Sequence, residues 1–177
     1  MAALDLPKRK QIRLPEYDYS TPGAYFVTIC TQNRRCILSD IAVGALHEAP
    51  VVSVRLTEIG RVVDQVIQSL PARYSNMTVD HYVIMPNHIH LLLRIEAERA
   101  LREAPLREGE TRSLLSKAVG YLKMNCSKRI HGNRPGLQVF QRGYYEHVIR
   151  GEKDYLEIWE YIDTNPARWA EDCYYGE

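Results

Sequence analysis

The sequence predicts an α+β fold, a ferredoxin-like (split βαβ) antiparallel sheet with helices on one face and an extra C-terminal helix. The main observation is the order of apolar patterns, which reads strand, helix, two strands, helix, strand and a final helix. The second is size, because 177 residues can bury one proper core, and no internal repeat or linker divides them. Hydrophobic and charged fractions of 45% and 25% are those of an ordinary globular protein. We therefore expect a single domain over residues 1–177.

The first half of the chain predicts three clear strands and one helix. Residues 24–31 are rich in aromatic and β-branched residues and follow a Thr-Pro-Gly turn, which indicates a strand. Residues 39–53 are hard to place, with a short strand expected at 51–54. Thr57 can cap a helix with an apolar stripe up to Leu70, and Pro71 is expected to end it. Two strands, 77–85 and 88–95, then pair around Pro86-Asn87.

The second half predicts two helices separated by short strands. Residues 96–111 are charged and indicate an exposed connector. A long helix follows, capped by Thr111 or Ser113 and broken by the Gly- and Pro-containing stretch 131–136. Residues 139–149 contain one or two short aromatic strands, and the last helix runs from about 154 to 165, where Pro166 is expected to stop it.

Basic residues gather in two places, although the net charge is only +1. An N-terminal arm, residues 1–19, contains Lys8, Arg9 and Lys10. A second group between residues 112 and 150 includes Lys117, Lys123 and Arg142. A basic stripe of this kind suits a phosphate backbone, while the same pattern also occurs on solvated helix faces.

Features of secreted and membrane proteins are missing from the sequence. Residues 1–10 have no apolar stretch typical of a secretory signal, and no apolar run approaches the roughly 18 residues that a membrane-spanning helix needs. The four cysteines lack Cys-x-x-Cys spacing and are typical of reduced packing residues. We therefore expect a cytoplasmic protein that does not associate with membranes.

The most informative motif is His88-Ile89-His90, inside the apolar run 82–93. Side chains alternate along a strand, so both histidines project from one face while Ile89 packs beneath the helices. Paired imidazoles on a rigid strand can bind a divalent metal. The structural alternative is one buried, hydrogen-bonded histidine and one exposed histidine. The C-terminal helix is the element available to cover the histidine face.

That helix carries two further candidates, Tyr161 and Asn165, which are neighbours one turn apart. The Asn165 amide oxygen could complete a site of two imidazoles and one oxygen for Mg²⁺ or Mn²⁺. Tyr161 would then lie where a phenolate could attack a phosphate. The structural alternatives are a packed ring for Tyr161 and a C-cap for Asn165. Tyr155 is expected to point into the core.

Three segments together resemble the single-tyrosine HUH transposases, and among them the REP-associated tyrosine transposases. They are Tyr-Val-Ile-Met-Pro-Asn-His-Ile-His (82–90), Gln-Arg-Gly-Tyr-Tyr-Glu-His-Val-Ile-Arg (141–150) and Glu-Tyr-Ile-Asp-Thr-Asn-Pro (160–166). The resemblance covers roughly residues 20–170. It implies a ferredoxin-like fold and a transposase that cleaves and rejoins single-stranded DNA beside hairpins.

The resemblance also implies residue roles. His88 and His90 would bind the metal, and Tyr161 would attack a DNA phosphate to form a 5′-phosphotyrosine bond and free a 3′-hydroxyl. Asn165 would take the place of a glutamine found in insertion-sequence relatives. Those relatives are dimers, whereas the REP-associated branch includes monomers, so a homodimer and a monomer both stay open.

The remaining polar residues of the second segment have less specific roles. Tyr145 is expected to pack or to stack on a base, and His147 and Arg150 to contact DNA or support the site. A histidine-triad hydrolase is excluded because Leu92 stands where its next histidine is needed. The alternative that stays open is a domesticated protein that binds single-stranded DNA or RNA hairpins without cutting them.

Overall fold

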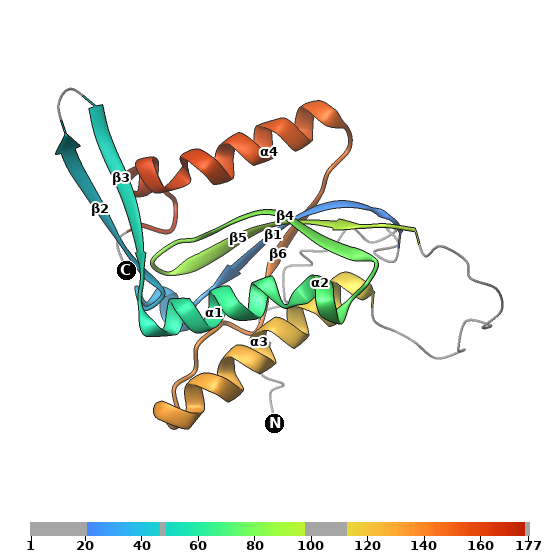
Figure 1. Cartoon of the computed structure of the whole chain (residues 1–177), viewed down its shortest axis with the longest axis horizontal. Helices are drawn as coiled ribbons and strands as arrows, with labels where there is room; N and C mark the ends of the chain where they lie inside the picture. Colours follow the sequence, from blue (N-terminus) through green and yellow to red (C-terminus); the bar gives the residue numbers. More distant parts are fainter. Residues whose placement is uncertain (1–20, 47–48, 98–112, 176–177) are drawn as a thin grey trace, which may run out of the picture.

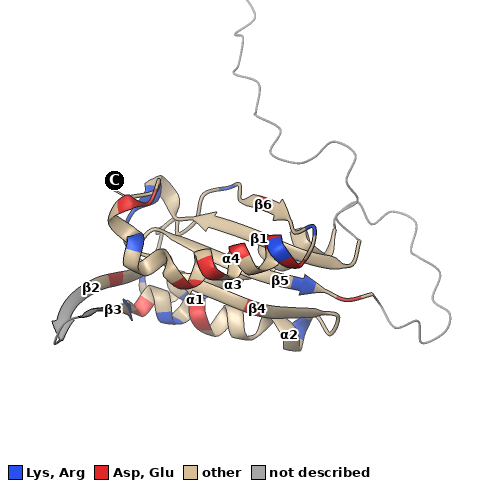
Figure 2. Cartoon of the chain, turned by 90° about the horizontal axis from the view of Figure 1, so that it is seen from above, with Lys and Arg blue, Asp and Glu red and all other residues tan. Residues whose placement is uncertain are grey.

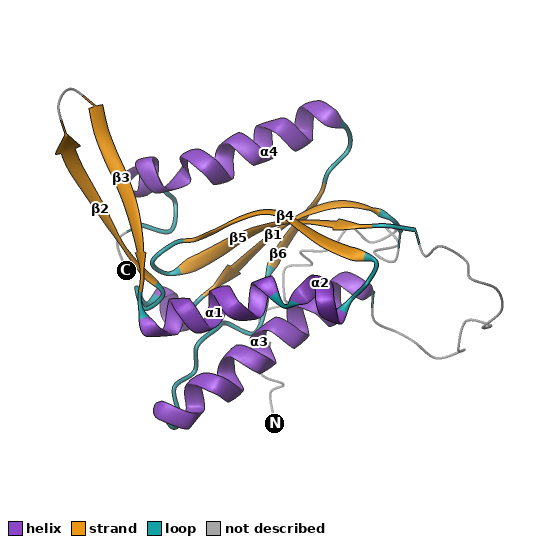
Figure 3. Ribbon diagram, viewed as in Figure 1, coloured by secondary structure: helices purple, strands orange, loops and turns teal. Residues whose placement is uncertain are grey.

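The computed structural model describes residues 21–46, 49–97 and 113–175. Its main sheet has the strand order β4-β5-β1-β6, and every neighbouring pair is antiparallel (Figures 1 and 3). The strands are β1 (Gly23–Cys30), β4 (Met77–Ile84), β5 (His88–Ile95) and β6 (Tyr145–Val148). The predicted α+β class with an antiparallel sheet is confirmed.

The helices connect strands that are not neighbours in the sheet. β1 and β4 flank β5, and α1 (Glu58–Gln68) lies between them in sequence. β5 and β6 flank β1, and α3 (Leu114–Asn133) lies between them in sequence. Each of these units is therefore a βαβ unit split by a strand of the other.

The sheet separates two cores of unequal size. α1, the short α2 (Leu70–Arg73) and α3 cover one face, and α4 (Glu152–Thr164) lies across the other (Figure 1). On the first side, Ile89, Leu91 and Leu93 of β5 are buried in the main core. On the second side, a smaller core of Phe26, Leu92 and Ile162 joins the sheet to α4. The predicted alternation of β5 is therefore present, with the histidine face turned toward α4.

Helix starts follow the predicted caps, whereas one predicted helix end is wrong. The Thr57 side chain accepts a hydrogen bond from the Gly60 amide at 3.0 Å, and Ser113 caps α3 through the Ser116 amide at 3.3 Å. Pro71 does not end a helix: α1 already ends at Gln68, and Pro71 lies in the first turn of α2. Proline fits there because first-turn amides have no partner within the helix.

The sequence did not identify the hairpin of β2 (Ser39–Leu46) and β3 (Ala49–Leu56), of which only a short strand at 51–54 was expected. The hairpin extends away from the main sheet (Figure 1) and contacts the 3₁₀ segment η2 (Asn165–Glu171). α4 ends at Thr164, one residue from the predicted end before Pro166. Pro166 lies in the first turn of η2, which follows α4 directly. The remaining element is a 3₁₀ turn, η1 (Gln32–Arg34).

Two predicted segments lie outside the described residues. These are the N-terminal arm, with Lys8, Arg9 and Lys10, and the connector from residue 98 onward. Within the described ranges, no helix combines the length and the apolar character needed to cross a membrane.

Candidate active site

The centre of the site is the start of β5, a strand that is paired on both sides. His88 and His90 stand opposite Cys30 and Thr28 of β1, and β4 pairs with the other edge of β5. Both imidazoles are almost fully buried, with exposed fractions of 0% and 1%. Their Nε2 atoms lie 2.9 Å apart. The strand therefore brings two imidazole nitrogens to one point with little freedom to move.

Hydrogen bonds fix the proton position of His88. The Asn87 amide nitrogen donates to the Tyr174 carbonyl oxygen at 2.8 Å, so its amide oxygen must face His88 Nδ1, at 2.9 Å. Because that oxygen only accepts, Nδ1 of His88 carries the proton and Nε2 presents its lone pair. Asn87 thus prepares His88 as a metal ligand.

His90 has a partner that suits either tautomer. Its Nδ1 lies 2.9 Å from the Thr28 hydroxyl, which can both donate and accept. If Nδ1 donates to Thr28, the Nε2 lone pairs of His88 and His90 converge. If Thr28 donates instead, His90 Nε2–H forms a hydrogen bond to His88. The pair is therefore able to bind a cation and to remain satisfied without one.

Burial keeps both imidazoles neutral. It lowers the pKa of His88 to about 4, an effect that Asp172 opposes and Arg34 reinforces. Burial also lowers the pKa of His90 well below its ordinary value, and the neighbouring His88 adds to this. Neutral imidazole is the form that ligates metals, so the environment favours the ligand form at neutral pH.

Tyr161 reaches the histidine pair from α4. Its hydroxyl oxygen lies 3.4 Å from His90 Nε2, and its ring packs edge-on against the rings of His90 and Phe26. The side chain is still 38% exposed, so a substrate can approach it. Burial raises the pKa of the phenol, and the nearby Asp172 carboxylate adds to the rise. The hydroxyl therefore holds its proton at neutral pH.

Two contacts with the sheet set the position of α4. Ile162, next to Tyr161, is buried in the smaller core. At the other end of the helix, the Tyr155 hydroxyl donates to Asp80 at 2.9 Å, and Arg94 binds the same carboxylate at 2.8 Å. Tyr155 was expected to point into the core. It is half-buried and packs against the smaller core, while its hydroxyl binds Asp80.

Asn165 and Asp172 are the candidate oxygen donors of the site. Asn165 is buried, and its Nδ2 donates to Asp172 Oδ2 at 2.9 Å. That carboxylate oxygen lies 3.9 Å from His88 Nε2, and His88, His90 and Asp172 form a group able to hold a metal ion. Sequence reasoning missed Asp172, since nothing in the local pattern showed that η2 folds back toward β5.

The donor set fits a divalent cation. In an octahedral site with bonds of about 2.1 Å, neighbouring ligand atoms are about 3 Å apart. The 2.9 Å between the two Nε2 atoms matches this spacing. Two imidazoles with amide or carboxylate oxygens suit Mg²⁺, Mn²⁺ and similar ions. A small pocket of about 140 Å³ opens beside Tyr161 and is lined also by Asn165, Arg168 and Asp172.

Comparisons with known proteins find relatives of this chain, although no family model matches it. An uncharacterized protein of Haemophilus influenzae is 33% identical over 175 residues, covering 94% of this chain and 93% of its own. A second protein of the same organism, described as a REP-associated tyrosine transposase, is 27% identical over 155 residues, or 85% of this chain and 74% of its own. A solved REP-associated tyrosine transposase bound to a REP hairpin shares the fold, with a TM-score of 0.58 and 22% identity over 88% of this chain and 74% of that one.

The chain is therefore similar to REP-associated tyrosine transposases in sequence and in fold. The resemblance first noted in three short segments extends along most of the chain.

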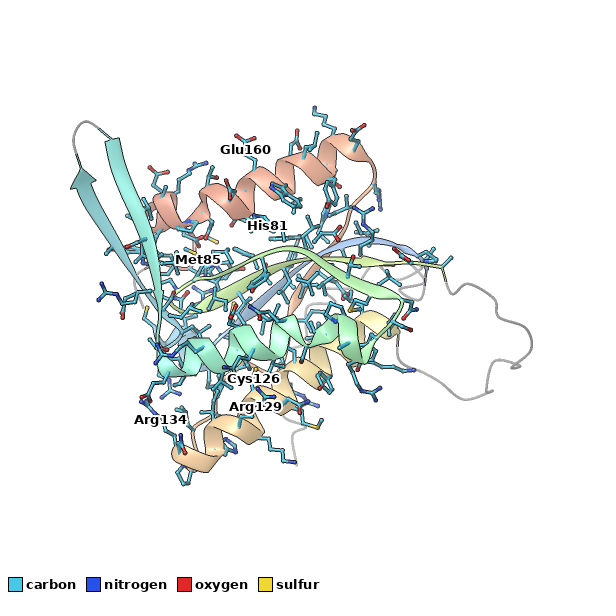
Figure 4. All side chains as sticks on the ribbon, in the orientation of Figure 1. His81, Met85, Cys126, Arg129, Arg134 and Glu160 are labelled. Atoms are coloured by element: carbon cyan, nitrogen blue, oxygen red, sulfur yellow. The ribbon has the colours of Figure 1, made fainter. Side chains whose placement is uncertain are left out.

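The predicted DNA-binding residues of this chain fall on two sides of the sheet. Lys117 and Lys123 belong to α3, on the face opposite α4. The Lys123 ammonium donates to the carbonyl oxygens of Gln141, at 3.0 Å, and of Gly143, so it holds the loop that contains Arg142. Figure 4 shows Arg129 and Arg134 on this helical side as well.

The other predicted residues lie on the side of the site. Tyr145 and His147 of β6 stand opposite Thr28 and Phe26, and opposed residues of paired strands share a face. Tyr145 is exposed and therefore available for stacking. His147 binds the Asp154 carboxylate at 3.0 Å, and the Arg150 amide donates to the same carboxylate at 3.0 Å, which ties β6 to the start of α4.

Proposed function

We propose that this protein is a metal-dependent transposase that cleaves and rejoins single-stranded DNA beside hairpins through a 5′-phosphotyrosine intermediate. One observation carries the proposal: the Tyr161 hydroxyl lies 3.4 Å from His90, beside two imidazoles able to bind one cation. A tyrosine that only packed its ring would have no need for its hydroxyl at the one point where metal ligands converge.

The reaction follows from these positions. The Tyr161 oxygen attacks the phosphorus of a phosphodiester as the phenol loses its proton, and the bond from phosphorus to the 3′ oxygen breaks. That oxygen takes up a proton and leaves as a 3′-hydroxyl, while the 5′ side stays joined to Tyr161. The reverse attack by a 3′-hydroxyl rejoins the strand, and no ATP is needed because one ester replaces another. A bound Mg²⁺ or Mn²⁺ would stabilise negative charge on the phosphate oxygens and favour loss of the phenol proton.

The surface charge indicates where the strand runs. Exposed acidic residues cover the outer side of α4, among them Glu157 and Glu160, and Glu160 points away from the sheet (Figures 2 and 4). A phosphate backbone would be repelled there. We place the strand instead along the β6 side of the site, past Tyr145 and toward Arg150. The hairpin in the solved relative supports a hairpin partner for this chain too.

One chain supplies every element of the proposed centre. Tyr161 and the histidines approach each other within the same subunit, which favours cleavage by a monomer in cis. A homodimer is not needed to complete this site. The cytoplasmic location stays a prediction.

Covalent trapping tests the proposal. Single-stranded DNA carrying the hairpins that flank the gene is incubated with the protein and Mg²⁺ or Mn²⁺, then analysed on a denaturing gel. We expect a metal-dependent adduct with the wild type and none with Tyr161→Phe. Tyr155→Phe is the matched control, since its hydroxyl binds Asp80 away from the site, and it should still form the adduct.

Other outcomes would redirect the assignment. Tyr174 packs its ring 4.6 Å from His88, so an adduct that survives Tyr161→Phe and disappears in Tyr174→Phe would move the nucleophile to Tyr174. Hairpin binding without an adduct under any metal would overturn the proposal in favour of the non-cleaving hairpin-binding protein.

A further inference from the structure

We infer that Asp172 is a positioning residue that turns the Asn165 amide so that its oxygen, rather than its nitrogen, faces the metal site. The inference rests on the proposed function and concerns a residue outside the three segments that marked the family. It begins with the hydrogen bonds of one buried carboxylate.

The Asp172 side chain is 1% exposed, and each of its oxygens accepts a hydrogen bond. Oδ1 accepts from the Tyr174 backbone amide at 2.7 Å, which forms a tight local turn. Oδ2 accepts from Asn165 Nδ2 at 2.9 Å. The backbone contact fixes the carboxylate, and the fixed carboxylate presents Oδ2 to Asn165.

A carboxylate oxygen accepts hydrogen bonds and has no hydrogen to give. The Asn165 amide must therefore place its NH₂ group toward Asp172 and its Oδ1 in the other direction. In that direction Oδ1 is buried and finds no hydrogen-bond partner among the described residues. Buried polar atoms are nearly always satisfied. The amide of Asn165 binds the Asp172 oxygen that lies 3.9 Å from His88 Nε2, so we assign its lone oxygen to a cation held by the same site.

A competing role for Asp172 is direct ligation, because its Oδ2 lies 3.9 Å from His88 Nε2. The hydrogen bonds favour the indirect role. Oδ2 already accepts a hydrogen bond from the Asn165 amide, and Oδ1 accepts one from the Tyr174 backbone amide. Direct ligation would place the second lone pair of Oδ2 on the cation, and removal of the carboxylate would then cost a ligand whether or not Asn165 is present.

The substitution Asp172→Asn separates the two roles. The Tyr174 amide still requires an oxygen, so the new amide keeps its oxygen there and presents NH₂ where Oδ2 was. Two NH₂ groups cannot face each other, and Asn165 must turn over to accept. Its own NH₂ group then points at the metal site, where it cannot bind a cation.

The test is a double-mutant cycle on Mn²⁺ affinity, measured on the full chain by electron paramagnetic resonance of free Mn²⁺ without DNA. We expect Asp172→Asn to weaken Mn²⁺ binding roughly tenfold or more, as supporting partners of metal ligands commonly do. In an Asn165→Ala background the same change should have no further effect. Asp163→Asn is the control for loss of one carboxylate, since Asp163 is an exposed α4 residue that contacts His81.

Additive losses in the two single variants would make Asp172 a direct ligand and overturn the inference. Unchanged affinity in Asp172→Asn would overturn it as well. Should Asp172→Asn fail to fold, the exchange variant Asn165→Asp with Asp172→Asn restores the pair with its polarity reversed. We expect it to fold and to bind Mn²⁺ at least as tightly as wild type, and weaker binding would contradict the inference. The adduct formed by wild-type protein reports separately on the proposed function.

Discussion

Gly60 allows helix α1 to approach the segment that leads into the site more closely than any other residue would. A Cβ atom at this position would lie 1.9 Å from the Leu38 carbonyl oxygen. That oxygen accepts a hydrogen bond from the Thr57 amide at 3.0 Å, and the Thr57 hydroxyl shares its proton between this oxygen, at 3.0 Å, and the Ile37 carbonyl oxygen, at 2.7 Å. The Leu38 amide in turn donates to the Pro86 carbonyl at 3.0 Å, just before the histidines. Gly60→Ala therefore disturbs the helix start and the turn before β5 together.

The size of the effect follows from these distances. Ordinary contact begins near 3.4 Å, so the Leu38 carbonyl would have to retreat by about 1.5 Å. Such a shift breaks both bonds to Thr57, at about 1 kcal/mol each. Overpacking adds about 1–3 kcal/mol, for a total loss of about 3–5 kcal/mol. Domains of this kind have only about 5–15 kcal/mol of stability, so the variant is expected to be close to unfolding.

Urea and thermal unfolding followed by circular dichroism measure this loss. For a chain of this size we expect a fall in Tm of about 6 °C or more. Gly120→Ala is the matched control, because a Cβ atom there meets nothing within 4 Å on an exposed part of α3. It should stabilise the protein by about 0.5–1 kcal/mol through helix propensity. If Gly60→Ala unfolds within about 1 kcal/mol of wild type, the reasoning from close approach is refuted.

Two further outcomes test the site and the core. Thr28→Val keeps the side-chain shape but removes the hydrogen-bond partner of His90 Nδ1, so Mn²⁺ affinity should fall roughly tenfold. An unchanged Mn²⁺ titration would show that the Thr28 hydroxyl does not support His90 as a ligand. Iodoacetamide at pH 8 should modify the exposed Cys36 and Cys173 in the native protein, as read by mass spectrometry. Cys126 should react only after unfolding, because burial raises the pKa of its thiol to about 12, and early modification would contradict the core assignment.

Much of the fold could be predicted because its strands and helices carry strong local periodicity. β5 shows this best: its alternate residues Ile89, Leu91 and Leu93 enter the main core, so the opposite face of the strand had to carry the histidines. The hairpin β2–β3 was missed because it stands away from the main sheet and contacts η2, a segment more than 100 residues later in the chain, which no local pattern shows.

The prolines show how far local rules reach. Pro71 and Pro166 were both expected to end a helix, since proline disfavours helical geometry in the residue before it. α4 does end at Thr164, as that rule expects, but each proline also lies in the first turn of a new segment that the sequence did not predict, α2 after α1 and η2 after α4. After Pro166 that turn carries the chain back toward β5. This reversal depends on contacts such as the Asn87 amide with the Tyr174 carbonyl, between residues 87 positions apart, and no local pattern records them.

The histidine pair of the site could be predicted from local sequence, whereas the candidate oxygen donors come together only in the folded chain. His88 and His90 are two residues apart on one strand, so their side chains share a face, and this spacing predicts a metal site. The oxygen donors depend on η2 being folded against the strand, through Asn87 and Tyr174. Asn87 links the two parts, because the same amide that binds the Tyr174 carbonyl fixes the proton on His88. The packing of the C-terminal segment and the tautomer of His88 that can bind a metal therefore depend on the same amide. A variant in which the C-terminal segment no longer contacts Asn87 is expected to lose that tautomer as well.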